Sequence, residues 1–296
     1  MYSHVVTSGT GPAMNHFRKI TFIIIILFNL LISTTACADK TEKYMSQGDN
    51  YLAQEQWNNA ITAYSLAIEE DPQLALAYSN RGYAYNELGE FDKAISDCSK
   101  AVELDSEYSM AYNHLGFAYA GKSQYNEAIA GFDRAIELNP SLTVAYNNRG
   151  LVYSGLYESE KAITDFDRAI ELDPQFAEAY NNRAATYASE SEFELAIADC
   201  NKAIELEPDF AAAYGLRGFA LSGIGELDEA IADCSKAIEL DPDLVQVYLY
   251  RGFTYVYKGQ IEEAIIDFEY CMNNATDPHI KETASLALEE LKNSSQ

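Results

Sequence analysis

Asparagines recur along the chain in two adjacent series, and successive positions within each series are 34 residues apart. A primary amide both donates and accepts hydrogen bonds, so a row of asparagines could bind successive peptide groups of an extended chain without reading its side chains. The alternative is that these asparagines are solvated helix residues. The first series contains Asn113, Asn147 and Asn181, and the second contains Asn80, His114, Asn148 and Asn182.

Aromatic residues follow the second series at the same spacing, three residues further along the chain. They are Tyr83, Phe117, Phe219 and Phe253, and Tyr250 replaces the asparagine before the last of them. Together with Leu216, Leu249 and Tyr257 they make the last part of the row more apolar. Aromatic clusters of this kind often dominate binding between proteins. The competing explanation is that part of this cluster packs against a helix at the C-terminal end of the chain.

Arginine and aspartate occur together, 16 residues apart, in five of the repeating segments. Two segments lose both partners at once: one has Gln47 with Ala63, and the other has Leu115 with Gly131. We therefore expect an ion pair inside each segment rather than between segments, and removal of one partner of a buried pair costs about 3–5 kcal/mol. The expected pairs are Arg81 with Asp97, Arg149 with Asp165, Arg183 with Asp199, Arg217 with Asp233 and Arg251 with Asp267.

Prolines, tyrosines and small residues share one register, which divides the chain into seven repeats without insertions. Position 4 of every repeat is tyrosine, small residues stand at positions 8 and 20, and proline marks position 32 in five repeats. The sequence predicts a single array and not two domains. The repeats are 41–74, 75–108, 109–142, 143–176, 177–210, 211–244 and 245–278.

Each repeat is expected to form two helices, helix A at positions 1–14 and helix B at positions 18–31. Small residues at positions 8 and 20 allow the two helices to approach closely, and the tyrosines at positions 4 and 11 are expected in the core. The last repeat needs a lid, for which residues 279–296 remain. Asp277 is a suitable N-cap, and apolar residues from Ile280 to Leu291 predict a capping helix over 278–292.

These motifs resemble the tetratricopeptide repeat family over residues 41–278. The resemblance implies an all-α fold class, a right-handed superhelical solenoid of antiparallel helix pairs with a C-terminal capping helix. It also implies that helix A lines a concave groove, with positions 2, 5, 6, 9, 12 and 13 facing a ligand. The predicted peptide-binding groove contains Asn80, Tyr83, Asn113, His114, Phe117, Asn147, Asn148, Asn181, Asn182, Phe219, Tyr250 and Phe253.

Within this family, the asparagine row looks like the asparagine ladder in the repeat domain of O-GlcNAc transferases. Chaperone-binding members instead grip a terminal carboxylate with basic residues at positions 2 and 6. Position 2 is occupied here by Glu42, Leu76, Met110, Val144, Glu178, Ala212 and Gln246. The sequence therefore lacks the carboxylate clamp.

Residues suited to catalysis or metal binding are few. The sequence contains no HExxH, P-loop, GxSxG or paired-cysteine metal motif. Cysteines at one position of neighbouring repeats are at least about 8–10 Å apart, too far for a disulfide. We expect these cysteines to be small buried residues and the chain to have no enzymatic activity, cofactor or metal site. The cysteines are Cys98, Cys200, Cys234 and Cys271, and the histidines considered with them as metal ligands are His114 and His279.

The chain is strongly acidic, with 46 acidic and 20 basic residues and a formal net charge of −26. Such a surface repels phosphate backbones, which argues against nucleic acid as a partner. The acidic residues cluster at the turns and on helix B rather than on helix A. This distribution favours a role in solubility over a dedicated basic partner.

The N-terminal segment has the order of an export signal. Arg18 and Lys19 precede the apolar run TFIIIILFNLLI, and small residues follow it. Met14 is an alternative translation start, in which case residues 1–13 would not be part of the protein. Residues 1–38 then have three alternative fates: cleavage at Ala36-Cys37-Ala38, lipidation of Cys37, or retention as a membrane anchor. The segment Thr34 to Cys37 resembles a bacterial lipobox, although Thr34 replaces the usual leucine.

These features predict a non-enzymatic scaffold of the cell envelope, exported from the cytoplasm and either periplasmic or membrane-anchored. Its expected ligand is a peptide or protein segment in extended form, bound in the concave groove. The alternative is an accessory lipoprotein of an outer-membrane, pilus or secretion assembly machine.

Overall fold

The computed structural model describes residues 40–294, and within that range every regular element is a helix. A first helix at residues 40–52 is followed by fourteen more. They are α2 (Trp57–Glu70), α3 (Ala75–Glu87), α4 (Phe91–Leu104), α5 (Ser109–Gly121), α6 (Tyr125–Leu138), α7 (Thr143–Gly155), α8 (Ser159–Leu172), α9 (Ala177–Ser189), α10 (Phe193–Leu206), α11 (Ala211–Gly223), α12 (Leu227–Leu240), α13 (Val245–Lys258), α14 (Ile261–Asn274) and α15 (Pro278–Ser294).

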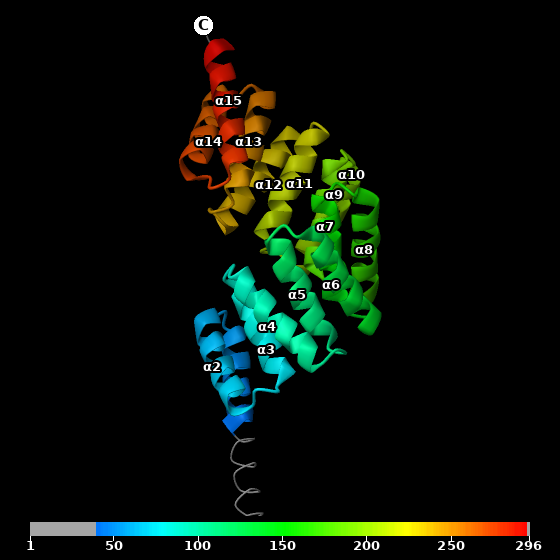
Figure 1. Cartoon of the computed structure of the whole chain (residues 1–296). Coiled ribbons are helices and arrows are strands. Elements are labelled where there is room, and N and C mark those ends of the chain that lie inside the picture. Colours follow the sequence, from blue (N-terminus) through cyan, green and yellow to red (C-terminus); the bar gives the residue numbers. More distant parts are fainter. Residues whose placement is uncertain (1–39, 295–296) are drawn as a thin grey trace, which may run out of the picture. The chain divides into compact units, whose positions relative to one another are not determined.

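The chain divides into two compact units, the first ending at Ser123 and the second beginning at Gln124. The sequence predicted one array, so this division is a difference. It falls between the helices of the third repeat, which carries Leu115 and Gly131 where five other repeats carry the arginine and the aspartate. Within each unit, consecutive helices pack as antiparallel neighbours, as α3 with α4 and α9 with α10 (Figure 1).

The helices keep the 34-residue register with a shift of one residue at some ends. From α3 to α12, helix A occupies positions 1–13 and helix B occupies positions 17–30 of each repeat. Helix B was expected at positions 18–31. Each helix B ends one residue earlier because position 31 is part of the following turn. There Asp71, Asp105 and Asp173 accept a hydrogen bond from the backbone N–H two residues later, at 2.9–3.0 Å.

The turn between helices A and B has a left-handed residue at position 15 in all seven repeats. Only three of these residues are glycine, so the surrounding turn imposes the conformation on larger side chains as well. The residues are Glu55, Gly89, Ser123, Tyr157, Ser191, Gly225 and Gly259, with φ between 56° and 88°.

Close approach of the two helices depends on the small residues at positions 8 and 20. A Cβ added to Gly150 would lie 2.7 Å from Cε1 of Phe166, and one added to Gly82 would lie 2.4 Å from Sγ of Cys98. The alanine at position 20 is fully buried in every repeat, as Ala162 illustrates. The core is therefore built on position 24, whose large members Tyr64, Phe132, Phe166 and Phe268 are fully buried.

The capping helix α15 covers α14 and is two residues longer than predicted. Asp277 caps it as expected, since Oδ1 of Asp277 accepts a hydrogen bond from the backbone N–H of His279 at 2.8 Å. Ala284, Leu288 and Leu291 of this helix form one core cluster with Phe268. The lid thus removes the apolar face of the last repeat from water.

Candidate functional site

All five arginine–aspartate pairs are present in the structure, and each is bidentate. Nε and Nη2 of the arginine donate to the two carboxylate oxygens of the aspartate in the same repeat, at 2.6–2.8 Å. Asp165 is 4% exposed. Two parallel charge-assisted bonds fix the orientation of helix A relative to helix B.

The remaining guanidinium nitrogen reaches the preceding repeat, which the sequence analysis did not predict. Nη1 of Arg149 donates to Oδ1 of Asp133 at 2.5 Å, and Nη1 of Arg183 donates to Asp167. Arg81, Arg217 and Arg251 donate in the same way to Ser65, Asn201 and Ser235, at 2.9, 2.6 and 3.0 Å. Each acceptor stands at position 25, so one arginine joins three helices. The hydrogen bond to Asp165 raises the pKa of Arg149 above its ordinary value, and Asp133 adds to this against the opposing effect of burial.

Tyrosines at positions 4 and 11 lie beside these arginines at the edge of the core. The Arg149 guanidinium lies 5.8 Å from the ring centre of Tyr146 and 6.0 Å from that of Tyr153. Both rings are only partly buried. The expectation that these tyrosines belong to the core holds in part: Tyr187 and Tyr214, for example, pack partly buried against core clusters, while in the repeats with an arginine the rings also contact its cation.

Asparagines of neighbouring repeats bond to one another on helix A. Nδ2 of Asn182 donates to Oδ1 of Asn147 at 3.0 Å, joining position 6 of one repeat to position 5 of the repeat before it. In the first unit, Ser79 and His114 occupy the same two positions, and a 3.0 Å hydrogen bond joins Oγ to Nδ1. At the next junction Leu216 offers no donor, and the buried Oδ1 of Asn181 has no partner among the described residues.

Not every predicted groove residue is accessible. Asn113 and Asn147 are 4% and 6% exposed, and Asn147 is covered by Asn182 of the neighbouring helix α9. Asn80, Asn148, Asn181 and Asn182 are partly buried. Phe117 is 39% exposed and Leu151, at the same position of the next repeat, is 43% exposed. Position 9 is therefore the more accessible part of the predicted groove.

The sequence left two roles open for the aromatic residues of the last two repeats: binding a partner or packing against the capping helix. The structure assigns the packing role to some of them only. Phe253 and Leu249 belong to the core cluster that contains the capping helix, and the ring of Phe253 lies 5.1 Å from that of Phe268. Phe219 instead lies between Phe193 and Tyr250, outside that cluster, and Tyr257 is 68% exposed.

His114 lies in an aromatic environment in the first unit. Its ring stacks on Tyr83 with 5.1 Å between the ring centres. Burial lowers the pKa of His114 to about 4, so the imidazole is neutral near pH 7. Cys98, Cys200, Cys234 and Cys271 are buried and unoxidised, and burial raises the pKa of each thiol. Cys37 lies outside the described residues.

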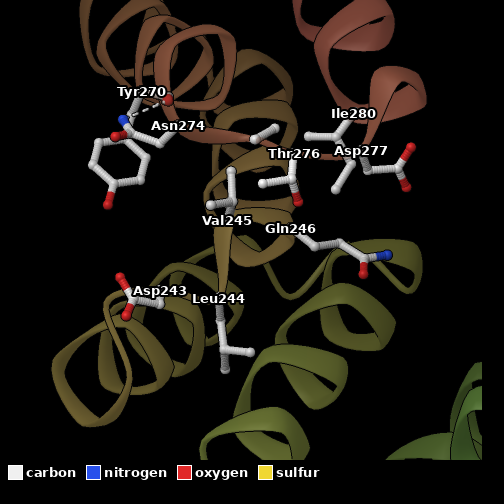
Figure 2. Close-up of a pocket in the computed structure, with 10 residues that line it drawn as sticks. Asp243, Leu244, Val245, Gln246, Tyr270, Asn274, Thr276, Asp277 and Ile280 are labelled. Atoms are coloured by element: carbon white, nitrogen blue, oxygen red, sulfur yellow. Dashed lines mark hydrogen bonds between the residues drawn. The ribbon is translucent and has the colours of Figure 1, made fainter. Parts of the chain in front are cut away.

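A cavity of about 450 Å³ lies near the C-terminal end of the second unit, and Gln246, which lines it, donates a hydrogen bond to the hydroxyl of the predicted groove residue Tyr250. Figure 2 shows Asp243 and Leu244 of the turn before α13 on one side, and on another Thr276 and Asp277 of the turn before α15 with Ile280 of α15 itself. Asn274 lines it at position 30, where repeats two to six have leucine. Its polar groups serve local structure, since Asp277 caps α15 and Tyr270 donates to the Pro242 carbonyl at 3.2 Å.

Residues 40–294 hold no group of three or more histidine, cysteine or acidic side chains arranged to bind a metal ion. In the same range, no helix is both long enough and apolar enough to cross a membrane.

Comparison with known proteins identifies the repeats. A family model described as tetratricopeptide repeat matches residues 75–108, 109–142, 177–210 and 211–244, and a second, described as TPR repeat, matches 48–89 and 158–190. Together these ranges cover more than half of the chain.

Solved structures share the fold. One chain of the APC/C hetero-tetramer Cut9–Hcn1 aligns with a TM-score of 0.73 and 17% identity, over 83% of this chain and 48% of that chain. A tetratricopeptide repeat protein from Parabacteroides merdae aligns at 0.64 and 18% identity, over 84% and 99%. PilW, described as a type IV pilus biogenesis factor, aligns at 0.61 and 20% identity, over 68% and 94%. The predicted all-α repeat fold is confirmed, and the chain belongs to the tetratricopeptide repeat family.

Proposed function

We propose that this protein is a non-enzymatic scaffold of the cell envelope that binds extended segments of other proteins along its A helices. A tetratricopeptide repeat fold supports protein–protein interaction in general. The observation that carries the proposal is at position 9, where five of the seven repeats have a large aromatic or aliphatic side chain, Asp49 and Ala185 being the exceptions, and where Phe117 of the first unit and Leu151 of the second are exposed. Exposed apolar side chains in a repeating row favour a protein ligand that covers them.

Hydrogen bonding along the same helices favours a peptide over a small molecule. Asn182 and Asn147 already bond to each other, and the Oδ1 atom of Asn181 is left without a donor. That acceptor is shielded from solvent, so the partly buried amides of Asn148 and Asn182 at position 6 are the groups that a peptide backbone could bond. A bound extended chain would bond to such amides and cover the apolar row at the same time.

Photocrosslinking in the native cell tests this proposal. A photoreactive amino acid replaces Leu151, 43% exposed at position 9, or Tyr257, 68% exposed on α13. The matched control replaces Ile266, which is 65% exposed but lies on the B helix α14. We expect the same envelope protein to be captured from positions 151 and 257 and not from 266. Equal capture at all three positions, or none at 151 and 257, would contradict a binding surface on the A helices.

The envelope location rests on the sequence before residue 40, which lies outside the described residues. Arg18 and Lys19 followed by an apolar run support export, and Cys37 supports lipid attachment as one route to membrane anchoring. Mass spectrometry of the mature N-terminus distinguishes a cleaved chain that begins after residue 38, a lipid-modified Cys37 and an intact leader. Recovery of the intact protein from the cytoplasm would overturn the envelope assignment.

A role as an accessory lipoprotein of an outer-membrane, pilus or secretion assembly machine is the second candidate. PilW shares the fold at a TM-score of 0.61, and its description as a pilus biogenesis factor makes a pilus machine one system to test. Copurification with such a machine at endogenous expression levels favours this candidate, and a captured partner unrelated to any of these machines would count against it.

A further inference from the structure

Three aromatic rings form a cluster twice in the chain, once in each unit and at identical repeat positions. The first aromatic trio is Trp57, Tyr83 and His114, at positions 17, 9 and 6 of three successive repeats. The second aromatic trio is Phe193, Phe219 and Tyr250, four repeats further along. The ring centres are 6.1 and 5.1 Å apart in the first trio and 6.1 and 4.7 Å apart in the second.

The two trios differ in the charge beside them. Glu55 stands at position 15 and Glu87 at position 13 near the first trio, whereas Ser191 and Gly223 occupy the same positions beside the second. Glu87 lies one helical turn after Tyr83 on α3, and burial, followed by the charges of Glu87 and Glu55 and a hydrogen bond to Glu87, raises the pKa of the Tyr83 hydroxyl. The first trio is thus an aromatic wall with two carboxylates at its edge.

These two carboxylates are not used in the ion pairs of the fold. Glu90 pairs with Lys93 and Glu158 with Lys161 in comparable turns. Neither Glu55 nor Glu87 has a cationic partner within residues 40–294, and both are exposed. Burial raises the pKa of the Glu87 carboxyl, and the Tyr83 hydroxyl partly offsets this. Two unneutralised carboxylates beside a partly buried ring favour a positively charged ligand.

Aromatic faces attract cations as well, and the fold already uses this interaction in its arginine–tyrosine contacts. His114 stacks on Tyr83 and is neutral near pH 7, so it does not repel a cation held beside that ring. We infer that the first aromatic trio, with Glu55 and Glu87, binds a lysine or arginine side chain of the extended protein segment that the chain holds. This inference rests on the proposed function and adds to it a requirement for a basic residue in the ligand.

Selection from a random peptide library displayed on phage tests the requirement on the full mature chain. We expect lysine and arginine to be enriched among peptides selected by the wild-type protein. The enrichment should disappear with Glu55→Gln combined with Glu87→Gln. The control combines Glu103→Gln with Glu107→Gln, two exposed residues of the same unit, and removes the same charge. Equal enrichment by both double variants would overturn the inference.

Trp57 provides a direct reading of the site because it is the only tryptophan in the chain. A synthetic copy of the best selected peptide should change the Trp57 fluorescence in a saturable way. Replacing its basic residue by leucine, or binding it to the Glu55→Gln and Glu87→Gln variant, should weaken the affinity by about tenfold or more. A peptide that binds equally well with lysine and with leucine contradicts the inference, as does a fluorescence change caused by self-association without peptide.

Failure of this inference and failure of the proposed function are distinguishable. If crosslinking from positions 151 and 257 captures a partner but selected peptides show no basic preference, only the charge requirement is wrong. If neither experiment finds a ligand, both are wrong. Circular dichroism of each double variant verifies that the fold is intact before affinities are compared.

Discussion

Asn182 donates a hydrogen bond to Asn147 across the junction of the fourth and fifth repeats, with 3.0 Å between Nδ2 and Oδ1. Asn147 is 6% exposed, so this bond satisfies an acceptor that water reaches poorly. The asparagine row predicted as a ligand contact therefore also holds neighbouring repeats in register.

Replacing Asn182 by leucine, the residue at this position of the next repeat, should leave the Asn147 acceptor unsatisfied. We expect the free energy of unfolding to fall by about 1–3 kcal/mol, as measured by urea denaturation. Asn147→Ala in the same chain should restore part of the loss. If both variants are as stable as the wild type, the bond contributes nothing to the stack.

Replacing Arg149 by leucine should destabilise the second unit because Asp165 remains buried without a cation. The expected loss in free energy of unfolding is about 3–5 kcal/mol, measured by thermal and urea unfolding. Arg149→Leu combined with Asp165→Gly recreates the leucine and glycine of the third repeat and should lose less. Arg168→Leu serves as the control, since the Arg168 pair with Glu171 is exposed and is worth at most about 1 kcal/mol. Equal melting temperatures for all three variants would argue against a stabilising role for the buried pair.

Two glycines on α7 should respond oppositely to alanine. Gly150→Ala places a methyl group 2.7 Å from Cε1 of Phe166 and should cost about 1–3 kcal/mol. A Cβ at Gly155 meets nothing within 4 Å, so Gly155→Ala should be neutral or stabilise by up to about 1 kcal/mol through helix propensity. Urea unfolding of both variants measures the difference. A Gly150→Ala protein as stable as Gly155→Ala would show that α7 and α8 are not closely packed.

His114 should make the first unit less stable as the pH falls. Its pKa is about 4 in the folded protein against an ordinary value of 6.5, because burial disfavours the charged ring. Between pH 6.5 and 4 the unfolded chain binds a proton that the folded chain does not, so the free energy of unfolding decreases as the pH is lowered through this range. From pH 7 to 5 this amounts to about 2 kcal/mol.

The substitution His114→Asn introduces the residue that three other repeats have at repeat position 6. It should remove this part of the pH dependence of stability. Urea unfolding followed through Trp57 reports on the first unit at each pH. His279→Asn is the control, because His279 is exposed on α15. If His114→Asn and the wild type lose the same stability between pH 7 and 5, burial of the imidazole is not the cause.

Much of the repeat architecture could be predicted from the sequence because each contact that defines it uses one residue type at one position. Arg149 and Asp165 vary together with their equivalents, so the pair is visible without a structure. The contact from Arg149 to Asp133 is harder to detect, because position 25 is serine, aspartate, asparagine or glutamate in different repeats. Only the shared property of accepting a hydrogen bond identifies it.

The candidate site was less predictable, for two physical reasons. A helix position that faces a groove in general can be covered by a neighbouring side chain, as Asn147 is by Asn182. The aromatic trios are spread over three repeats each, so no single repeat contains their signal. The recurrence of Trp57, Tyr83 and His114 as Phe193, Phe219 and Tyr250 becomes visible only when repeats one to three are compared with five to seven.

The acceptor at position 25 has a consequence for how such an array changes its length. Every repeat carries at position 25, on helix B, an oxygen-bearing side chain that can accept a hydrogen bond from the arginine of the repeat that follows. If residues 177–210 were deleted, Arg217 would meet Asp167 in place of Asn201, and no guanidinium would lose a partner. Whole repeats can thus be gained or lost by recombination without mismatched charges at the new junction.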